Sequence, residues 1–272
     1  MNRAIIKTMA VALMAMATVT ASAQFGNLGN RIKQGVKNKV QSKTYQATHN
    51  PSGVIDEVAS RTRSDKQAQS KVECTVAGKT YKIDGRINHE GWNKSQNSRV
   101  TFTGIPATIE EFMQVQRTLG TEPQGAVALQ VMAFEMFRRD RALGEEALRL
   151  NNTSTNYNST VAQLKEVMGS DASYARPYIA AALMDGAKNT NAYEPKYPYC
   201  VKIRVNPVNK YQESEFLEGT VIYLQIDSEG WDTNWRGVEV VRPEGTDYFV
   251  VSNCPALYTQ CKKIKGTWQG LK

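Results

Sequence analysis

Histidine is scarce in this chain: among 272 residues there are only His49 and His89. A Ser-His-Asp or Cys-His arrangement needs a histidine that a third group holds in place, and no serine lies in a G-x-S-x-G sequence. The glycine-rich phosphate-binding motifs and H-E-x-x-H are missing as well, because "HEGWN" begins like the zinc motif and stops. We interpret His89 as a loop residue, and we expect neither a metal nor a cofactor.

Cysteine is also sparse, with four residues and no C-x-x-C pair, so zinc and thioredoxin-type redox sites are poor interpretations. In an oxidising compartment an even number of cysteines favours disulfides. Cys254 and Cys261 flank the short stretch "PALYTQ" and are expected to pair, which leaves Cys74 to pair with Cys200. The alternative is that some of the four are free and buried.

Long apolar runs are missing except at the start, where residues 8–19 are uncharged and largely apolar. Arg3 and Lys7 flank that run, and an A-x-A sequence ends at Ala23. This is the pattern of a secretory signal peptide covering residues 1–23, cut between Ala23 and Gln24. A membrane anchor is the alternative, but spanning a bilayer takes about 20 residues. We therefore expect an exported protein, periplasmic or secreted.

Charge is concentrated near the start of the chain. The formal net charge is +8, of which residues 24–70 carry +5 and residues 71–272 only +1. A nucleic-acid-binding domain should show a basic face of its own. The sequence therefore predicts no nucleic-acid partner for the body of the protein.

Residues 24–43 combine that charge with a thin apolar stripe at helical spacing. Such a basic amphipathic segment favours weak attachment to an anionic membrane surface, although three glycines weaken the helix. The alternative is a solubilising leader that binds nothing. Residues 44–70 are polar and are expected to form a disordered linker. The stripe and its flanking charges are Phe25, Leu28, Arg31, Ile32, Lys33, Val36, Lys37, Lys39 and Val40.

Residues 71–272 are expected to form a single α+β domain, in which a helical layer packs on an antiparallel sheet with a C-terminal meander, preceded by a β-hairpin. Thr108 and Glu111 form a capping-box pattern at a helix start, and residues 124–139 are apolar on nearly every side, which is typical of a buried helix. Strand patterns cover residues 71–85 (the hairpin), 99–104, 199–205, 219–227, 236–243 and 247–253. Further helices are expected at residues 143–150, 158–169 and 176–186.

One acidic and aromatic stretch, "DSEGWDTNW" at residues 227–235, is a candidate ligand site. Carboxylates can bind hydroxyl groups or a cation, and tryptophan rings can stack on sugars, although a full Ca²⁺ loop is missing. The alternative is a solvated turn between two strands, where Asp, Ser, Gly and Asn are common. The candidate residues are Asp227, Glu229, Trp231, Asp232 and Trp235.

Several stretches occur in a recognisable order: "TFTGIPATIEEF", "AVALQVMAF", "YARPYIAAALMDGA", "PYCVKIRVNP" and "GVEVVRP…DYFVVSN". Over roughly residues 99–260 the chain resembles a family of bacterial, often exported, α+β domains of uncharacterised function. The resemblance implies a fold and supplies no functional residue. Because no catalytic set can be assembled, we expect a non-catalytic module at the cell envelope that binds an envelope component or a partner protein. The alternative is a carboxylate-dependent glycan hydrolase.

Overall fold

The structure is a computed structural model that describes residues 72–87, 96–169, 175–217 and 219–266. All of these belong to the unit Gln69–Lys272. The expected signal peptide, the basic segment 24–43, the linker 44–70 and His89 lie outside the described residues.

Eight strands form one antiparallel sheet in the order β1-β2-β3-β4-β6-β7-β8, and β5 pairs with β6. The predicted hairpin is confirmed, and it joins the same sheet as the C-terminal meander because β3 lies between β2 and β4. The strands are β1 (Val72–Val76), β2 (Lys79–Asp84), β3 (Asn97–Phe102), β4 (Tyr199–Val205), β5 (Tyr211–Ser214), β6 (Gly219–Asp227), β7 (Trp235–Val241) and β8 (Val250–Asn253).

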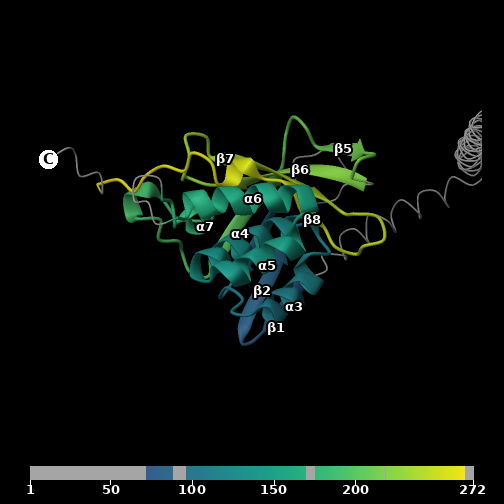
Figure 1. Cartoon of the computed structure of the whole chain (residues 1–272), viewed down its shortest axis with the longest axis horizontal. Helices are drawn as coiled ribbons and strands as arrows, with labels where there is room; N and C mark the ends of the chain where they lie inside the picture. Colours follow the sequence, from purple (N-terminus) through teal and green to yellow (C-terminus); the bar gives the residue numbers. More distant parts are fainter. Residues whose placement is uncertain (1–71, 88–95, 170–174, 218, 267–272) are drawn as a thin grey trace, which may run out of the picture. The chain divides into compact units, whose positions relative to one another are not determined.

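The helices gather on one side of the sheet, where they pack on one another and on the strands (Figure 1). This confirms the α+β class and the helical layer. The helices are α3 (Ile109–Leu119), α4 (Pro123–Arg139), α5 (Arg141–Asn151), α6 (Ser154–Val167) and α7 (Ile179–Ala182), with short 3₁₀ turns at Asn189–Asn191 and Pro255–Leu257. None of the helices in the described part of the chain has the length and apolarity to cross a bilayer.

Helix α4 is the centre of the core, as its sequence predicted. Every residue from Pro123 to Phe137 is buried. Helix α5 approaches it closely because position 144 is a glycine: a Cβ there would lie 2.0 Å from the Cα of Phe137. The burial of α4 stops at its last two residues, Arg138 and Arg139, which are exposed.

The start of α3 follows the predicted capping box only in part. The Thr108 hydroxyl accepts a hydrogen bond from the Glu111 amide at 3.3 Å. The Glu111 carboxylate accepts from the amide of Ala107 at 2.8 Å, and Lys79 donates to it at 2.7 Å. The helix start is therefore tied to strand β2.

The helix predicted at residues 176–186 is wrong in length, because α7 contains only four residues. Two contacts, one from the β6–β7 turn and one from β4, draw the chain away from the helix. The Ser228 hydroxyl donates to the carbonyl of Ala182, and the amide of Asp185 donates to the carbonyl of Cys200 at 2.8 Å. The chain after α7 is therefore drawn to the edge of β4.

Neither predicted disulfide is present, and all four cysteines are free thiols. Cys74 aligns with Tyr81 on the face under the helices, whereas Cys200 aligns with Thr101 on the other face. The two cysteines are also three strands apart, or about 14 Å, beyond the roughly 7 Å that a disulfide allows between Cα atoms.

The other predicted pair, Cys254 and Cys261, has thiols that contact different groups. The Cys254 thiol lies 3.5 Å from the side-chain amides of Gln130 and Asn156, under the helices. The Cys261 thiol donates to the hydroxyl of Tyr193 at 3.8 Å. The two sulfurs therefore face different elements, so the alternative of free, partly or fully buried thiols describes the structure.

Candidate ligand-binding site

A pocket of about 320 Å³ opens between the end of α4, helix α7, the start of β4 and the segment that joins α7 to β4. We call it the tyrosine pocket, and we call residues 184–196 the pocket loop. The walls of the tyrosine pocket are mostly apolar or aromatic, and among the described residues that line it the charged groups come from the end of α4. The lining residues are Ile105, Glu135, Arg138, Arg139, Pro177, Tyr178, Ala181, Met184, Ala192, Tyr193, Pro195 and Tyr199.

Two stacked tyrosines form part of the wall of the pocket. The rings of Tyr178 and Tyr193 are 4.6 Å apart between centroids and 11° from parallel. The Tyr193 hydroxyl donates to the carbonyl of Lys262 at 2.8 Å. Burial raises the pKa of this hydroxyl, so it remains a donor at neutral pH. The C-terminal segment thus holds the ring from behind.

The charged side of the pocket is a carboxylate between two guanidinium groups. Glu135 is 8% exposed and accepts from Arg138 through Nε at 2.8 Å and Nη2 at 2.7 Å. Arg139 donates to the same carboxylate through Nε at 2.8 Å. Burial alone would raise the pKa of Glu135, but the hydrogen bonds from Arg138 and Arg139 outweigh it and the net shift is downward. This side of the pocket therefore carries one negative and two positive charges.

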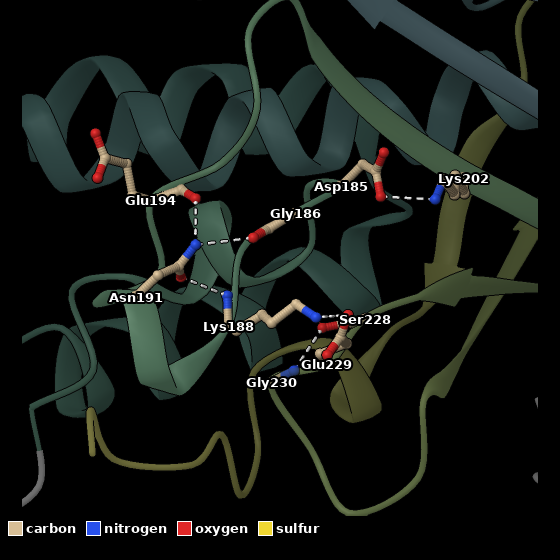
Figure 2. A network of polar contacts seen from close by, with 9 residues as sticks. All are labelled: Asp185, Gly186, Lys188, Asn191, Glu194, Lys202, Ser228, Glu229 and Gly230. Carbon is tan, nitrogen blue, oxygen red and sulfur yellow. Dashed lines mark hydrogen bonds and ion pairs between the residues drawn. The ribbon is translucent and has the colours of Figure 1, made fainter.

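The side chain of Asn191 fixes the shape of the pocket loop (Figure 2). Its Nδ2 donates to the carbonyls of Gly186 at 2.9 Å and Glu194 at 3.0 Å. Its Oδ1 accepts from the amide of Lys188 at 2.8 Å. These bonds hold a turn in which Ala192 and Tyr193 have φ angles of 54° and 59°, which is costly for residues other than glycine. The turn delivers Tyr193 to the pocket.

Two ion pairs hold the pocket loop against the sheet (Figure 2). Lys188 contacts Glu229 at 2.9 Å, and Asp185 contacts Lys202 of β4 at 2.6 Å. Burial alone would raise the pKa of Asp185, but its hydrogen bond from Lys202 lowers it. The loop is thus joined to both β4 and the β6–β7 turn.

The candidate ligand stretch 227–235 does not form one site. Trp231 is 2% exposed, and its Nε1 donates to the carbonyl of Thr259, so it cannot present a face to a sugar. The Asp232 side chain is 99% exposed and contacts Lys262 at 3.2 Å. Ser228 donates through its amide to the carbonyl of Asn234 at 2.7 Å, which closes a turn. The structure therefore agrees with the alternative, a turn between β6 and β7.

The other members of that stretch point to different neighbours. Glu229 anchors Lys188, as described above. Asp227 and Trp235 are cross-strand partners on the sheet face that lies away from the helices. The guanidinium of Arg204 lies over the Trp235 ring, 3.8 Å from its centre, and so covers one face of the ring. Burial raises the pKa of Asp227, and the positive charges of Lys202 and Arg204 counteract this shift in part.

Within the described part, no group of His, Cys, Asp and Glu side chains is arranged to hold a metal.

A cluster of buried amide side chains lies in the core and stabilises the fold. Asn152 and Asn156 are buried, and Gln130 exchanges hydrogen bonds with Asn152 at 3.0 and 3.1 Å. Asn156 donates to Asn152 at 2.6 Å and to the thiol of Cys254 at 3.5 Å. These amides satisfy one another in the core, which is how buried polar groups are retained.

Sequence reasoning missed the pocket. One local signal was available, because glutamate followed by arginines three and four positions later forms ion pairs on one side of a helix. That spacing occurs in Glu135, Arg138 and Arg139 at the end of α4. No local spacing predicts that the pocket loop lies next to α4, because contacts with the sheet place the loop there.

The family comparison covers this whole region. The domain-of-unknown-function family DUF6935 matches residues 104–265. The chain belongs to the DUF6935 family. All residues that line the tyrosine pocket fall within the match, whereas strands β1 to β3 of the same sheet precede it. No curated protein and no solved structure matches the chain. The DUF6935 assignment agrees with the resemblance to an uncharacterised α+β family.

Proposed function

We propose that this DUF6935 protein is a non-catalytic binding module that is exported and acts at the cell envelope, where its tyrosine pocket receives an apolar group of a ligand or partner. The observation that carries the proposal is the pocket of about 320 Å³ with three tyrosines in its wall. Its size and mostly apolar lining are typical of ligand sites. The one carboxylate among its described lining residues, Glu135, is held by two arginines and is not free to act as an acid or base.

The methyl group of Met184 is the reporter for this proposal, because Met184 is buried and lines the pocket. The full chain is labelled at methionine methyls and titrated with N-acetyl-L-phenylalanine and with its neutral amide. We expect at least one of them to shift the Met184 signal and to leave that of Met113, exposed on α3, unchanged. The signal of Met184 is assigned through Met184→Leu.

Two matched variants locate the binding. Ala181→Phe places a ring in the pocket and should abolish the shift of Met184. Ala142→Phe adds the same ring to the exposed side of α5 and should leave it intact. If neither probe moves Met184, or if Ala181→Phe binds as well as the parent, the tyrosine pocket is not a ligand site.

Export and envelope attachment are supported by the N-terminal sequence pattern and the basic segment 24–43. The exported protein should begin at Gln24 by intact mass, and a species that retains "MNRAIIK" would contradict this. It should sediment weakly with phosphatidylglycerol vesicles at low salt and be released at 1 M salt, where the screening length is about 3 Å.

The vesicle test has a matched pair of variants with equal loss of charge. Replacing Lys33, Lys37 and Lys39 by Gln should abolish sedimentation, because each basic residue near such a surface contributes about 1 kcal/mol. Replacing Arg61, Arg63 and Lys66 of the linker by Gln should preserve it. Equal behaviour of the two variants would show that the segment is only a solubilising leader.

A second candidate is carboxylate-dependent glycan hydrolysis, and one observation favours it. Asp185 and Asp227 both interact with Lys202, and their environments shift the two pKa values in opposite directions. Acid and base pairs in glycosidases are tuned in this way. An ion pair with Lys202 at 2.6 Å argues against this function, because it engages the Asp185 carboxylate. If the protein releases sugars from peptidoglycan or nitrophenyl glycosides, and Asp227→Asn removes that activity, the hydrolase replaces the binding module.

A further inference from the structure

The arginines beside the tyrosine pocket indicate which ligands it prefers, an inference that rests on the proposed binding function. A guanidinium has five N–H donors. Arg138 gives two of its hydrogen bonds to Glu135, and Arg139 gives one. The two carboxylate oxygens are thus shared among three donors, and the terminal nitrogens of Arg139 make no hydrogen bond within the described part of the chain. Donors remain for a second acceptor.

The charges around the pocket do not cancel. Among the lining residues that the structure describes, the charged side chains are Glu135, Arg138 and Arg139, which leaves one positive charge in excess. Both arginines are about half exposed, with side-chain values of 42% and 52%, so a ligand can reach them from solvent. A cation would be repelled, and an anion would be attracted.

Glu135 also prepares the arginines for binding. A flexible arginine loses side-chain entropy when it binds an anion, and a group that is already held loses less. Arg138 is held through both Nε and Nη2, and Arg139 through Nε. The planar fork of an arginine matches a carboxylate, which can accept two parallel hydrogen bonds from it.

We propose that the tyrosine pocket binds apolar carboxylates: the apolar group lies against Tyr178, Tyr193 and Met184, and the carboxylate pairs with Arg139 and Arg138. An aromatic residue at the C-terminus of a peptide and a free aromatic acid share this chemistry. The carboxylate lies at the mouth and the ring inside, since the arginines are exposed and the Tyr193 ring is buried.

The test compares two probes of nearly equal shape that differ in charge. N-acetyl-L-phenylalanine is an anion at pH 7, and N-acetyl-L-phenylalaninamide is neutral. Binding to the full chain is followed through the Met184 methyl signal. We expect the acid to bind at least about tenfold more tightly, since charge-assisted hydrogen bonds are roughly twice as strong as neutral ones. Salt should weaken binding of the acid and leave that of the amide unchanged.

Variants of Arg139 separate charge from shape. Arg139→Gln should remove the preference for the acid and retain the weak binding of the amide. Arg139→Lys should retain part of the preference, because the charge stays and the planar fork is lost. Arg149→Gln is the control: it removes one positive charge from an exposed position on α5, where Arg149 contacts Tyr157 instead of the pocket. Its acid preference should equal that of the parent.

Phenylacetate, tested in parallel, distinguishes the two sources. Tighter binding of N-acetyl-L-phenylalanine indicates a peptide C-terminus, and tighter binding of phenylacetate indicates a free acid; both support the proposal. Equal binding of the acid and its amide overturns the carboxylate preference and leaves the binding function standing. No shift of Met184 with any probe overturns both.

Discussion

The ring of Tyr193 lies parallel to that of Tyr178, with 4.6 Å between the centroids. The two residues belong to different segments, since Tyr178 directly precedes α7 and Tyr193 lies in the pocket loop. Their stacking depends on a turn in which Tyr193 has a φ of 59°. The position of this wall of the pocket therefore depends on the conformation of that turn.

Asn191→Ala should loosen the pocket loop. Its amide group makes three hydrogen bonds to backbone groups of the loop, and a net contribution of about 0.5–1.5 kcal/mol is typical for each, less where the group is exposed. We expect a loss of about 1–2 kcal/mol in the free energy of unfolding, measured in urea, and weaker shifts of Met184 with ligand. Asn189→Ala in the same turn is the control, and an equal effect of both changes would contradict this role for Asn191.

Glu135→Gln should reduce stability in a pH-dependent way. The carboxylate has a lowered pKa in the folded state, so its contribution is present above the ordinary glutamate pKa of about 4.3 and is lost as pH falls through the folded value. The difference in Tm between parent and variant should therefore be largest near neutral pH and shrink below about pH 4. Because both arginines are half exposed, we expect Glu135→Gln to lower the free energy of unfolding at neutral pH by about 0.5–1 kcal/mol at most.

Glu146→Gln, on the exposed side of α5, is the matched control for this pH series. Its Tm should stay close to that of the parent at neutral pH. A difference between parent and Glu135→Gln that is constant from pH 7 to pH 3 would show that the carboxylate charge does not stabilise the fold.

Gly144→Ala should destabilise the contact between α4 and α5. The added Cβ would lie 2.0 Å from the Cα of Phe137, and backbone atoms cannot move aside as a flexible side chain can. Overpacking of this kind costs about 1–3 kcal/mol or more, which chemical denaturation would measure. Gly237→Ala is the control, because nothing lies within 4 Å of a Cβ added there. Equal stability of the two variants would contradict the close packing of these helices.

The cysteines should be recovered as thiols. Non-reducing peptide mapping of the protein from its native compartment should find no bridge between Cys74 and Cys200, which lie on opposite faces of the sheet. In the folded protein Cys254 should react last with iodoacetamide, because it is fully buried and burial raises its pKa. A bridged peptide that contains Cys74 and Cys200 would require a different sheet from the one described.

The sequence predicted most elements of the sheet and the helical layer because their patterns are local. Alternation in residues 199–205 and the all-round apolar character of α4 each reflect burial of a single element. The short strand β5 was missed, and its residues show why: Tyr211, Gln212 and Glu213 are all exposed, so no alternation marks them. The helix at 176–186 was predicted too long because Ser228 and Cys200, which end it, are distant in sequence.

The sequence by itself determined the class of fold and the buried central helix, since each depends on composition or on neighbours along the chain. Export and a basic leader stay predictions from the same kind of local pattern. Tertiary structure alone decided the state of the cysteines and the position of the pocket. The register of the strand pairs places Cys74 and Cys200 on opposite faces of the sheet, and the ion pair between Asp185 and Lys202 holds the pocket loop at the sheet. Such relationships depend on which strands become neighbours, and no local spacing in the chain encodes that.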